Sequence, residues 1–384
     1  MKLIIFEDYL TENLKPFSFN HAVFEIKTGL FSNLDRFIDS FSEYEIYLIV
    51  RDEIKDVIKF RFPNYNINPD IVPSGQCINA KVVWDKEYIK LLDNENLLLF
   101  NNKLEISLEE FNSKIRLLKN DNTYDNSISY INYIWDSIYL FNSKIQKDFL
   151  KIKKKFPSNI DKVHLINKDS ISIKDNVSIK PGVIIDATNG PVYINDNTKI
   201  DIGALIQGPV FIDKNSYISP GSKIRGGTLI GPNCKIGGEV TSSIFHGKSN
   251  KVHDGFIGHS YIGEWVNIGA GTNNSNLKNN YSNIKINFGN NIVDSNKTFL
   301  GSMIGDFSRI SISTSINTGT FIGIGSNIFN HNFNNKFIDS FSWGNDEKVD
   351  FIKFIKTCKL MFKRRDFYLH KSEEELLKYL YKNI

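Results

Sequence analysis

A six-residue repeat of isoleucines runs through the middle of the chain and constrains its fold more than any other feature. The same spacing recurs from Ile173 to Ile206 and from Ile304 to Ile328. Its longest unbroken run is Ile212, Ile218, Ile224, Ile230 and Ile236. A period of six fits neither an amphipathic helix nor an alternating strand. It fits a triangular coil in which each sixth aliphatic side chain points inward and small residues form the corners, with stacked coils ~4.8 Å apart.

The repeat therefore predicts a left-handed parallel β-helix from about residue 171 to residue 329. Chance spacing in an isoleucine-rich chain would not produce the long unbroken run. A solenoid of this kind cannot bury its lateral faces alone, so we expect it to associate.

The sequence before the repeat has a different pattern. Helical patterns at residues 30–41 and 53–60 lie between its apolar runs, which is typical of an α/β domain. The apolar runs that indicate buried parallel strands are Leu3–Phe6, Ile46–Val50 and Leu97–Phe100.

Helical periodicity appears again on both sides of the repeat. Residues 130–155 read as a helix that leads into the β-helix, and residues 348–384 as helices that cap its end or pack against a neighbouring subunit. The predicted domains are an α/β domain at 1–155, a β-helix at 156–332 and a helical tail at 333–384.

Composition excludes several classes of protein. The net charge of +4 is spread along 384 residues without a basic stripe, so we expect no nucleic-acid partner. No apolar run reaches the ~18 residues of a membrane span. The cysteines Cys77, Cys234 and Cys358 are widely spaced and odd in number, which favours a reducing compartment. The chain is expected in the cytoplasm.

The isoleucine repeat is interrupted between residues 238 and 261 and again between residues 273 and 298. Interruptions of a solenoid usually hold functional loops, because the scaffold fixes their ends. The first interruption contains three histidines, His246, His253 and His259.

The segment that begins at His253 carries a specific motif. An Ile-Gly-x-x-x-Asn-Ile-Gly-Ala-Gly-Thr run follows at 262–272, and Asn276 comes four residues later. This segment resembles the acetyltransferase half of the bifunctional UDP-N-acetylglucosamine pyrophosphorylase/glucosamine-1-phosphate N-acetyltransferase family. The whole chain resembles a subgroup with a shortened nucleotidyltransferase-like half, through Ser249–Gly255, Ser275–Tyr281 and Ser340–Gly344.

The resemblance implies a homotrimer that uses acetyl-CoA in nucleotide-sugar biosynthesis. It assigns His253 as the base, which suits an imidazole that titrates near pH 6.5. It assigns Asn276 as a sugar contact and Ser302 as a CoA contact. The backbone N–H of Ala270 would stabilise the oxyanion at the thioester. His246 and His259 are interpreted as loop or surface residues.

Two departures concern the phosphate of the acceptor sugar. The family holds it with an Arg before a Pro-Gly corner and with a Lys further on, but Ser219 and either Ser242 or Ser243 stand at these places. The sequence leaves two explanations open: the acceptor differs, or other cations replace the family's pair. The candidate substrate-binding cations are Arg225, Lys251 and Lys278, together with Lys248.

The N-terminal half departs further. The Gly-rich loop that cradles a triphosphate in the family is replaced by Glu7–Leu10, and the family's Arg-Pro by Asn20–His21. Asn101–Asn102 stands where the family has an Mg²⁺-binding Asp, and a neutral amide is a poor substitute. Lys15, Arg51 and Lys81 are the charges nearest the family's substrate positions, and we interpret them as surface residues. Mg²⁺ is expected only if this domain is active.

The leading hypothesis is an acetyl-CoA-dependent N-acetyltransferase for an amino-sugar phosphate or a nucleotide amino sugar. The alternative is a sugar-1-phosphate nucleotidyltransferase whose β-helix serves only to form the trimer. A third hypothesis is a scaffold or regulatory binder that has lost both activities.

Overall fold

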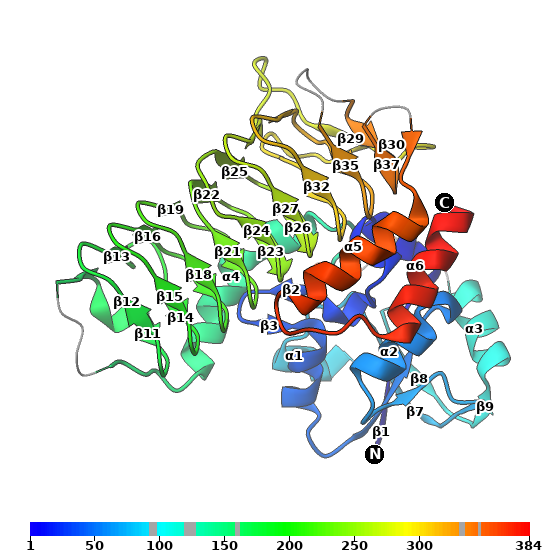
Figure 1. Cartoon of the computed structure of the whole chain (residues 1–384). Helices are drawn as coiled ribbons and strands as arrows, with labels where there is room; N and C mark the ends of the chain where they lie inside the picture. Colours follow the sequence, from blue (N-terminus) through cyan, green and yellow to red (C-terminus); the bar gives the residue numbers. More distant parts are fainter. Residues whose placement is uncertain (92–97, 119–127, 158–161, 330–334, 345–346) are drawn as a thin grey trace. The chain divides into compact units, whose positions relative to one another are not determined.

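The computed structural model describes the chain except for residues 92–97, 119–127, 158–161, 330–334 and 345–346. It consists of two compact units (Figure 1). Unit 1 comprises residues 1–136 and 359–384, and unit 2 comprises residues 137–358. The boundary predicted at residue 333 and the first residue of the predicted strand at 97–100 lie outside the described residues.

Unit 1 is built on a five-stranded sheet with the order β5-β4-β1-β7-β8. These strands are β1 (Lys2–Phe6), β4 (Glu45–Ile49), β5 (Asn66–Ile67), β7 (Gly75–Asn79) and β8 (Leu99–Asn102). Short antiparallel pairs are β2 (Lys27–Thr28) with β3 (Phe31–Ser32), and β6 (Ile71–Val72) with β9 (Ile106–Ser107). The helices of this unit are α1 (Asn33–Ser40), α2 (Lys55–Arg61), α3 (Leu108–Leu117) and α6 (Lys371–Asn383).

The central strand of this sheet is β1, whose Leu3–Phe6 run is fully buried. Strands β4 and β7 flank it in parallel, which confirms the predicted α/β layout. Strand β8 differs from the prediction, because it pairs antiparallel with β7 at the sheet edge. The carboxyl ends of β1 and β7 meet where the strand order reverses direction, the usual place for a site in such a sheet.

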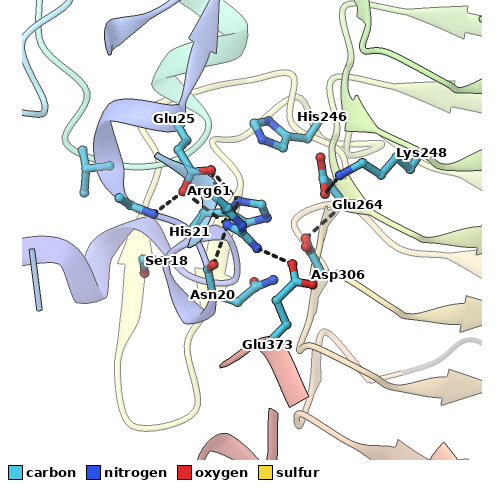
Figure 2. A network of polar contacts seen from close by, with 12 residues as sticks. Ser18, Asn20, His21, Glu25, Arg61, His246, Lys248, Glu264, Asp306 and Glu373 are labelled. Carbon is cyan, nitrogen blue, oxygen red and sulfur yellow. Dashed lines mark hydrogen bonds and ion pairs between the residues drawn. The ribbon is translucent and has the colours of Figure 1, made fainter. Parts of the chain in front are cut away.

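Helix α6 belongs to unit 1 and lies against α2. Arg61, the last residue of α2, makes an ion pair with Glu373 of α6 at 3.4 Å (Figure 2). The same guanidinium donates to Glu25 and to the backbone oxygen of Asn20. Burial alone would raise the pKa of Glu25, but Arg61 and His21 outweigh burial and hold it at about 2.

Unit 2 contains a parallel β-helix with three faces, as the isoleucine repeat predicts (Figure 1). Face 1 comprises β10 (His164–Ile166), β13 (Ile184–Asp186), β16 (Leu205–Gln207), β19 (Lys223–Ile224), β22 (Glu239–Thr241) and β25 (Phe256–Gly258). Face 2 comprises β11 (Ile171–Ile173), β14 (Val192–Ile194), β17 (Val210–Ile212), β20 (Thr228–Ile230), β23 (Ile244–Gly247), β26 (Tyr261–Glu264), β31 (Met303–Ile304), β34 (Phe321–Ile322) and β36 (Phe337–Ile338). Face 3 comprises β12 (Ser178–Ile179), β15 (Lys199–Ile200), β18 (Tyr217–Ile218), β21 (Lys235–Ile236), β24 (Asn250–Lys251), β27 (Asn267–Ile268), β32 (Arg309–Ile310), β35 (Asn327–Ile328) and β37 (Ser342–Trp343), with β38 (Glu347–Lys348) antiparallel at its end.

The isoleucines of the repeat form one buried core along the inside of these faces. Each aliphatic side chain is stacked on its counterpart in the next coil, for example Ile218 on Ile236. Burying each such side chain contributes about 1.5–3 kcal/mol. The columns of isoleucine therefore stabilise the coil stack throughout its length.

The two predicted interruptions have different structures. Between residues 238 and 261 the coils continue through β22, β23, β24 and β25, so the loop predicted there is wrong. The repeat is hidden because Val240, Phe245 and Lys251 take inward positions and the corner after Ile236 is shortened. The coil that contains β27 continues into β28 (Asn273–Asn274), which pairs with β33 (Ser315–Ile316).

The second interruption is a true insertion. It carries a hairpin of β29 (Lys285–Asn287) and β30 (Ile292–Asp294) between the coil of β28 and the coil of β31. Where the insertion leaves the coil, Asn274 replaces main-chain pairing: its amide bonds both the N–H and the C=O of Gly258. The insertion thus leaves the stack without disturbing it.

The helices that flank the β-helix are divided between the units. Helix α4 (Asp136–Lys151) falls almost wholly in unit 2, about twenty residues before the predicted boundary at 155. Phe354 of α5 (Phe351–Lys363) packs on Phe307 and Phe341, so the beginning of this helix covers the last coils. The prediction that the whole tail caps the β-helix or a neighbour differs from this arrangement, because α6 belongs to unit 1. Among the described helices, none has the length and apolar character needed to cross a bilayer.

Candidate active site

His253 lies at a corner of the β-helix, in the turn between β24 of face 3 and β25 of face 1. We call this edge of the prism the 3/1 corner. Its described residues in successive coils are 162, 180–182, 201–203, 219–221, 237–238, 252–254, 269–271 and 311–313. The side chain of His253 is exposed, and within the described residues no hydrogen bond engages its imidazole.

The next coil places Ala270 beside His253. Asn250 pairs with Asn267, and the N–H of Gly271 donates to the carbonyl of Asp254 at 2.8 Å, so residue 270 is stacked on residue 253. Coils of this kind are ~4.8 Å apart. The carbonyl of Ala270 accepts from the N–H of Ser313, whereas its own N–H has no partner in the part of the chain that the structure describes. A proton acceptor and a free N–H donor therefore lie one coil apart at one corner.

Asn276 lies elsewhere, at the opposite end of face 1. Its Nδ2 is 2.9 Å from Nδ1 of His259, which directly follows β25, whereas His253 precedes that strand. His259 adopts a positive φ of 49° and is stacked on Phe299 with ring centroids 5.3 Å apart. Burial lowers the pKa of His259 to about 4, so its imidazole is neutral at pH 7.

The pair formed by His259 and Asn276 was missed by sequence reasoning, which assigned His259 to the surface. The ring of Tyr139 in α4 lies 6.4 Å from that of His259, and its hydroxyl donates to the carbonyl of Phe299. Burial raises the pKa of Tyr139 to about 12. The only signal in the sequence was the spacing of 17 residues between His259 and Asn276, which equals the local coil length.

Ser302 is buried rather than open to a cofactor. Its N–H donates to Oγ of Ser260 at 2.9 Å, and its own Oγ has no partner among the described residues. The side chain is 1% exposed. This position argues against the predicted contact between the Ser302 hydroxyl and CoA.

The predicted substrate-binding cations do not gather at His253. Arg225 is exposed at another corner, 3.2 Å from Glu239. Lys278 lies in the insertion and donates to the carbonyl of Asn283. Lys251 is fully buried inside the β-helix, and this burial argues against direct contact with substrate.

The other positions singled out in the first interruption are structural. His246 is buried on β23, and its Nδ1 is 3.0 Å from the hydroxyl of Tyr261. Lys248 makes an ion pair with Glu264 at 2.7 Å (Figure 2). The serines that stand in place of the family's phosphate-binding cations fold into the coils: Ser219 and Ser243 are buried.

The carboxyl ends of the strands in unit 1 bear acidic residues that are already paired. Glu7 accepts from Nη1 of Arg51 at 2.8 Å and from the N–H of Val23. Burial raises the pKa of Glu7, although Arg51 opposes this effect. Asp8 makes an ion pair with Nζ of Lys81 at 2.9 Å, and both side chains are at least 97% buried. Arg51 and Lys81 are thus internal partners, and the interpretation of Lys81 as a surface residue is wrong.

An open cavity of about 270 Å³ adjoins these pairs. Its charged lining comprises Glu7, Asp8, Asp52, Glu53, Arg51 and Arg116. The excess of carboxylates would repel a triphosphate. Asn102 points its amide to the carbonyl of Pro73 at 2.9 Å, so it is a structural residue. Lys15 pairs with Glu12 at the surface.

Residues 3–156 match the family model described as sugar nucleotidyl transferase. A curated bifunctional sugar-1-phosphate nucleotidylyltransferase/acetyltransferase from Sulfurisphaera tokodaii is 35% identical over 97 residues, which are 25% of this chain and 24% of that protein. The chain thus matches only about a quarter of the length of this curated relative.

Of three solved structures that resemble the chain, two are described as acetyltransferases and one as a hexapeptide transferase family protein. A mutant of perosamine N-acetyltransferase from Caulobacter crescentus, in complex with CoA and GDP-perosamine, is 10% identical, with 71% of this chain and 88% of that chain covered and a TM-score of 0.21. A putative acetyltransferase from Bacillus cereus is 15% identical, with coverage of 56% and 98% and a TM-score of 0.18. A hexapeptide transferase family protein from Anaplasma phagocytophilum is 13% identical, with coverage of 57% and 93% and a TM-score of 0.15.

The family match of residues 3–156 and the curated relative are of the kind that the sequence motifs resemble. The narrower assignment to a subgroup with a shortened N-terminal half stays a prediction. The chain joins a domain that matches the sugar nucleotidyl transferase family to a β-helix with a six-residue repeat, and it is similar over 97 residues to a bifunctional sugar-1-phosphate nucleotidylyltransferase/acetyltransferase.

Proposed function

We propose that this chain is an acetyl-CoA-dependent N-acetyltransferase that works as a homotrimer in the cytoplasm. Its acceptor is an amino-sugar phosphate or a nucleotide-linked amino sugar. The observation that carries the proposal is the arrangement at the 3/1 corner, where the exposed imidazole of His253 lies one coil from the free N–H of Ala270.

The two groups have complementary roles in acetyl transfer. His253, when neutral, takes a proton from the ammonium of the acceptor, and the amine nitrogen then attacks the thioester carbonyl carbon. The N–H of Ala270 donates to the oxyanion that forms on that carbonyl. When the tetrahedral intermediate collapses, its C–S bond breaks and CoA leaves as a thiolate, and the proton that the nitrogen loses as the neutral amide forms passes to that thiolate.

A trimer would complete this site, because a single corner is too open to enclose CoA. Exposed apolar side chains mark the same edge: Ile202 is 56% exposed and Ile312 is 62% exposed. They support an association of copies along the 3/1 corner. In such a trimer we assign Asn276 to the acceptor site as the predicted sugar contact, supplied from the other end of face 1.

Both candidate acceptors carry phosphate, so the cations near His253 are relevant to how either one binds. The 3/1 corner carries Ser219 and Pro220 two coils below His253, and the cations among its described residues, Lys162 and Lys180, lie at least four coils from His253. The first phosphate is bonded to the anomeric oxygen in both candidate acceptors, so both remain in the proposal. Three buried free cysteines support the cytoplasmic assignment.

The test is thiol release from acetyl-CoA by the purified full chain with a panel of amino sugars, amino-sugar 1-phosphates and nucleotide amino sugars. His253→Ala should lower kcat by about 10²–10⁴-fold, the usual contribution of a general base. His164→Ala is the matched control, because His164 is an exposed histidine on the first strand of face 1, five coils from His253, and it should leave the rate unchanged. Full activity of His253→Ala would refute the mechanism.

The alternative function is transfer of a nucleotidyl group to a sugar 1-phosphate with Mg²⁺. The match of residues 3–156 to the sugar nucleotidyl transferase family favours it. The paired acids Glu7 and Asp8 at the strand ends and the amide at Asn102 oppose it. Release of pyrophosphate from UTP and a sugar 1-phosphate would establish this activity. Calorimetry that detects neither acetyl-CoA nor nucleotide-sugar binding would instead favour the scaffold hypothesis.

A further inference from the structure

Lys251 occupies a position that isoleucine takes in the neighbouring coils. It lies on the inward column of face 3, where it pairs with Ile236 of the coil before. The next inward residue on this face is Ile268. Lys251 is among the largest fully buried side chains in the described structure. A lysine thus occupies an inward position of the β-helix that is aliphatic in the neighbouring coils.

The ammonium of Lys251 points toward the 3/1 corner. Its Nζ donates to the carbonyl of His253 at 2.8 Å. A Cβ built on Gly238, in the corner of the preceding coil, would lie 2.9 Å from Nζ, and Gly238 has a φ of +69°. The glycine and the shortened corner after Ile236 therefore leave the space that the ammonium occupies.

This arrangement is costly unless it serves another purpose. A buried ammonium loses its hydration, and within the part of the chain that the structure describes the hydrogen bond to His253 satisfies one of its three donors. Burial lowers the pKa of Lys251 to about 8, and Asp254 opposes this shift. An isoleucine would stabilise the column as it does in neighbouring coils. Unlike isoleucine, lysine at this position can donate a hydrogen bond to the main chain of the His253 turn.

We propose that Lys251 is a positioning residue that holds the His253 turn at a fixed height above the inward column, so that the imidazole keeps its place beside the N–H of Ala270. The turn at residues 252–254 is bound to the next coil through the carbonyl of Asp254, which accepts from the N–H of Gly271, and Lys251 binds the carbonyl of His253 from within the β-helix. A displacement of about 1 Å at such a site can lower a rate about 100-fold. This inference rests on the proposed acetyl transfer.

The test uses the full chain with Lys251→Ile and Lys251→Met. Isoleucine is the residue of the neighbouring coils and secures folding, and methionine keeps most of the side-chain length. Ile218→Met is the matched control, because it changes the same column two coils before Lys251. Three quantities are measured: kcat, KM for acetyl-CoA, and the rate of hydrogen exchange of the amides at residues 253–255.

We expect both Lys251 variants to lower kcat about 10- to 100-fold with little change in KM, and to speed exchange at residues 253–255. The control should leave kcat and this exchange at wild-type values. Wild-type kcat or unchanged exchange in both Lys251 variants would overturn the inference. An equal fall of kcat in Ile218→Met would also overturn it, because the effect would then belong to general packing.

The two proposals fail in different ways. If the wild-type chain acetylates no acceptor of the panel, the proposed function fails, and the exchange measurement alone decides whether Lys251 holds the turn. If the wild-type chain is active and the Lys251 variants are equally active, the positioning role fails while the function stands.

Discussion

Unit 1 and the β-helix treat their charged and polar groups in opposite ways. At the carboxyl ends of β1 and β7, Asp8 and Lys81 are buried and bound to each other. At the 3/1 corner, His253 is exposed and the N–H of Ala270 is free within the described chain. In the first region the charged groups are paired with each other inside the fold. In the second region the polar groups remain available to bind a ligand.

The difference has a physical origin. A doubly wound sheet places several side chains at one crevice, where they can neutralise each other once a phosphate loop is absent. A β-helix corner presents a short turn in each coil, so the coil spacing sets the distance between equivalent residues and their side chains cannot turn toward each other as freely. The comparison therefore predicts that unit 1 responds to charge substitutions through stability, and the corner through activity.

The largest expected effect on stability concerns Lys81. Lys81→Met leaves the buried carboxylate of Asp8 without its cation, and such a loss costs about 3–5 kcal/mol. Hydrogen exchange of the amides of β1 should accelerate accordingly, while kcat of acetyl transfer stays near wild type.

The double variant Asp8→Asn with Lys81→Met is the control, because it removes both charges. It should recover more than half of the lost stability. If Lys81→Met is as stable as wild type, the pair of Asp8 and Lys81 does not stabilise unit 1, and the contrast between unit 1 and the 3/1 corner is wrong.

A smaller effect concerns the pH dependence of the β-helix. The pKa of His259 is about 4 in the folded chain, against 6.5 for an ordinary histidine, because burial penalises its charged form. The unfolded chain binds the proton more readily between these values, so stability is complete above pH 6.5 and falls as pH drops toward 4. His259 should account for about 2–3 kcal/mol of this loss.

His259→Asn, which tolerates the positive φ at this position, should flatten the pH dependence. The observable is hydrogen exchange of the amides of β25 and β26 at pH 7 and pH 5. His164→Asn, at an exposed histidine, should keep the wild-type dependence. An unaltered slope in His259→Asn would show that this histidine is not held neutral by the fold.

The smallest effect concerns the ion pair between α2 and α6. Glu373→Gln removes the charge opposite Arg61 and keeps an acceptor for the backbone N–H of His370 at the start of α6. Unfolding in urea should show a loss of about 0.5–1 kcal/mol. Glu375→Gln, whose pair with Lys371 is exposed, should show none. A larger loss for Glu375→Gln would mean that burial does not distinguish these pairs.

The sequence predicted the β-helix because isoleucine at every inward position leaves a visible period. It missed the coils between residues 238 and 261 because a lysine, a phenylalanine and a shortened corner break the period without breaking the fold. The six-residue period in the sequence shows only which inward side chains are aliphatic. Whether the coils continue depends on hydrogen bonding between their main chains. The stem of Lys251 is apolar, and only the structure shows that it lies inside.

The site was predicted only in part, because a local motif indicates some of its residues and not the contacts that depend on the path of the chain. The motif at residues 262–272 indicated His253 and Ala270, and their stacking follows from the coil length. The contact between His259 and Asn276 and the burial of Ser302 depend on how the insertion leaves the coil, which no local pattern encodes. The amphipathic pattern of α6 likewise predicts a helix but does not specify the surface that it covers.

The division of unit 1 into residues 1–136 and 359–384 has a consequence for synthesis. A ribosome that adds ~5–20 residues per second produces the 222-residue span of unit 2, from residue 137 to residue 358, in about 10–45 s. During that interval the nascent first segment lacks α6, and the surface of α2 that receives Glu373 stays uncovered. The β-helix can wind coil by coil as it emerges, but the first unit to be translated is the last to be completed.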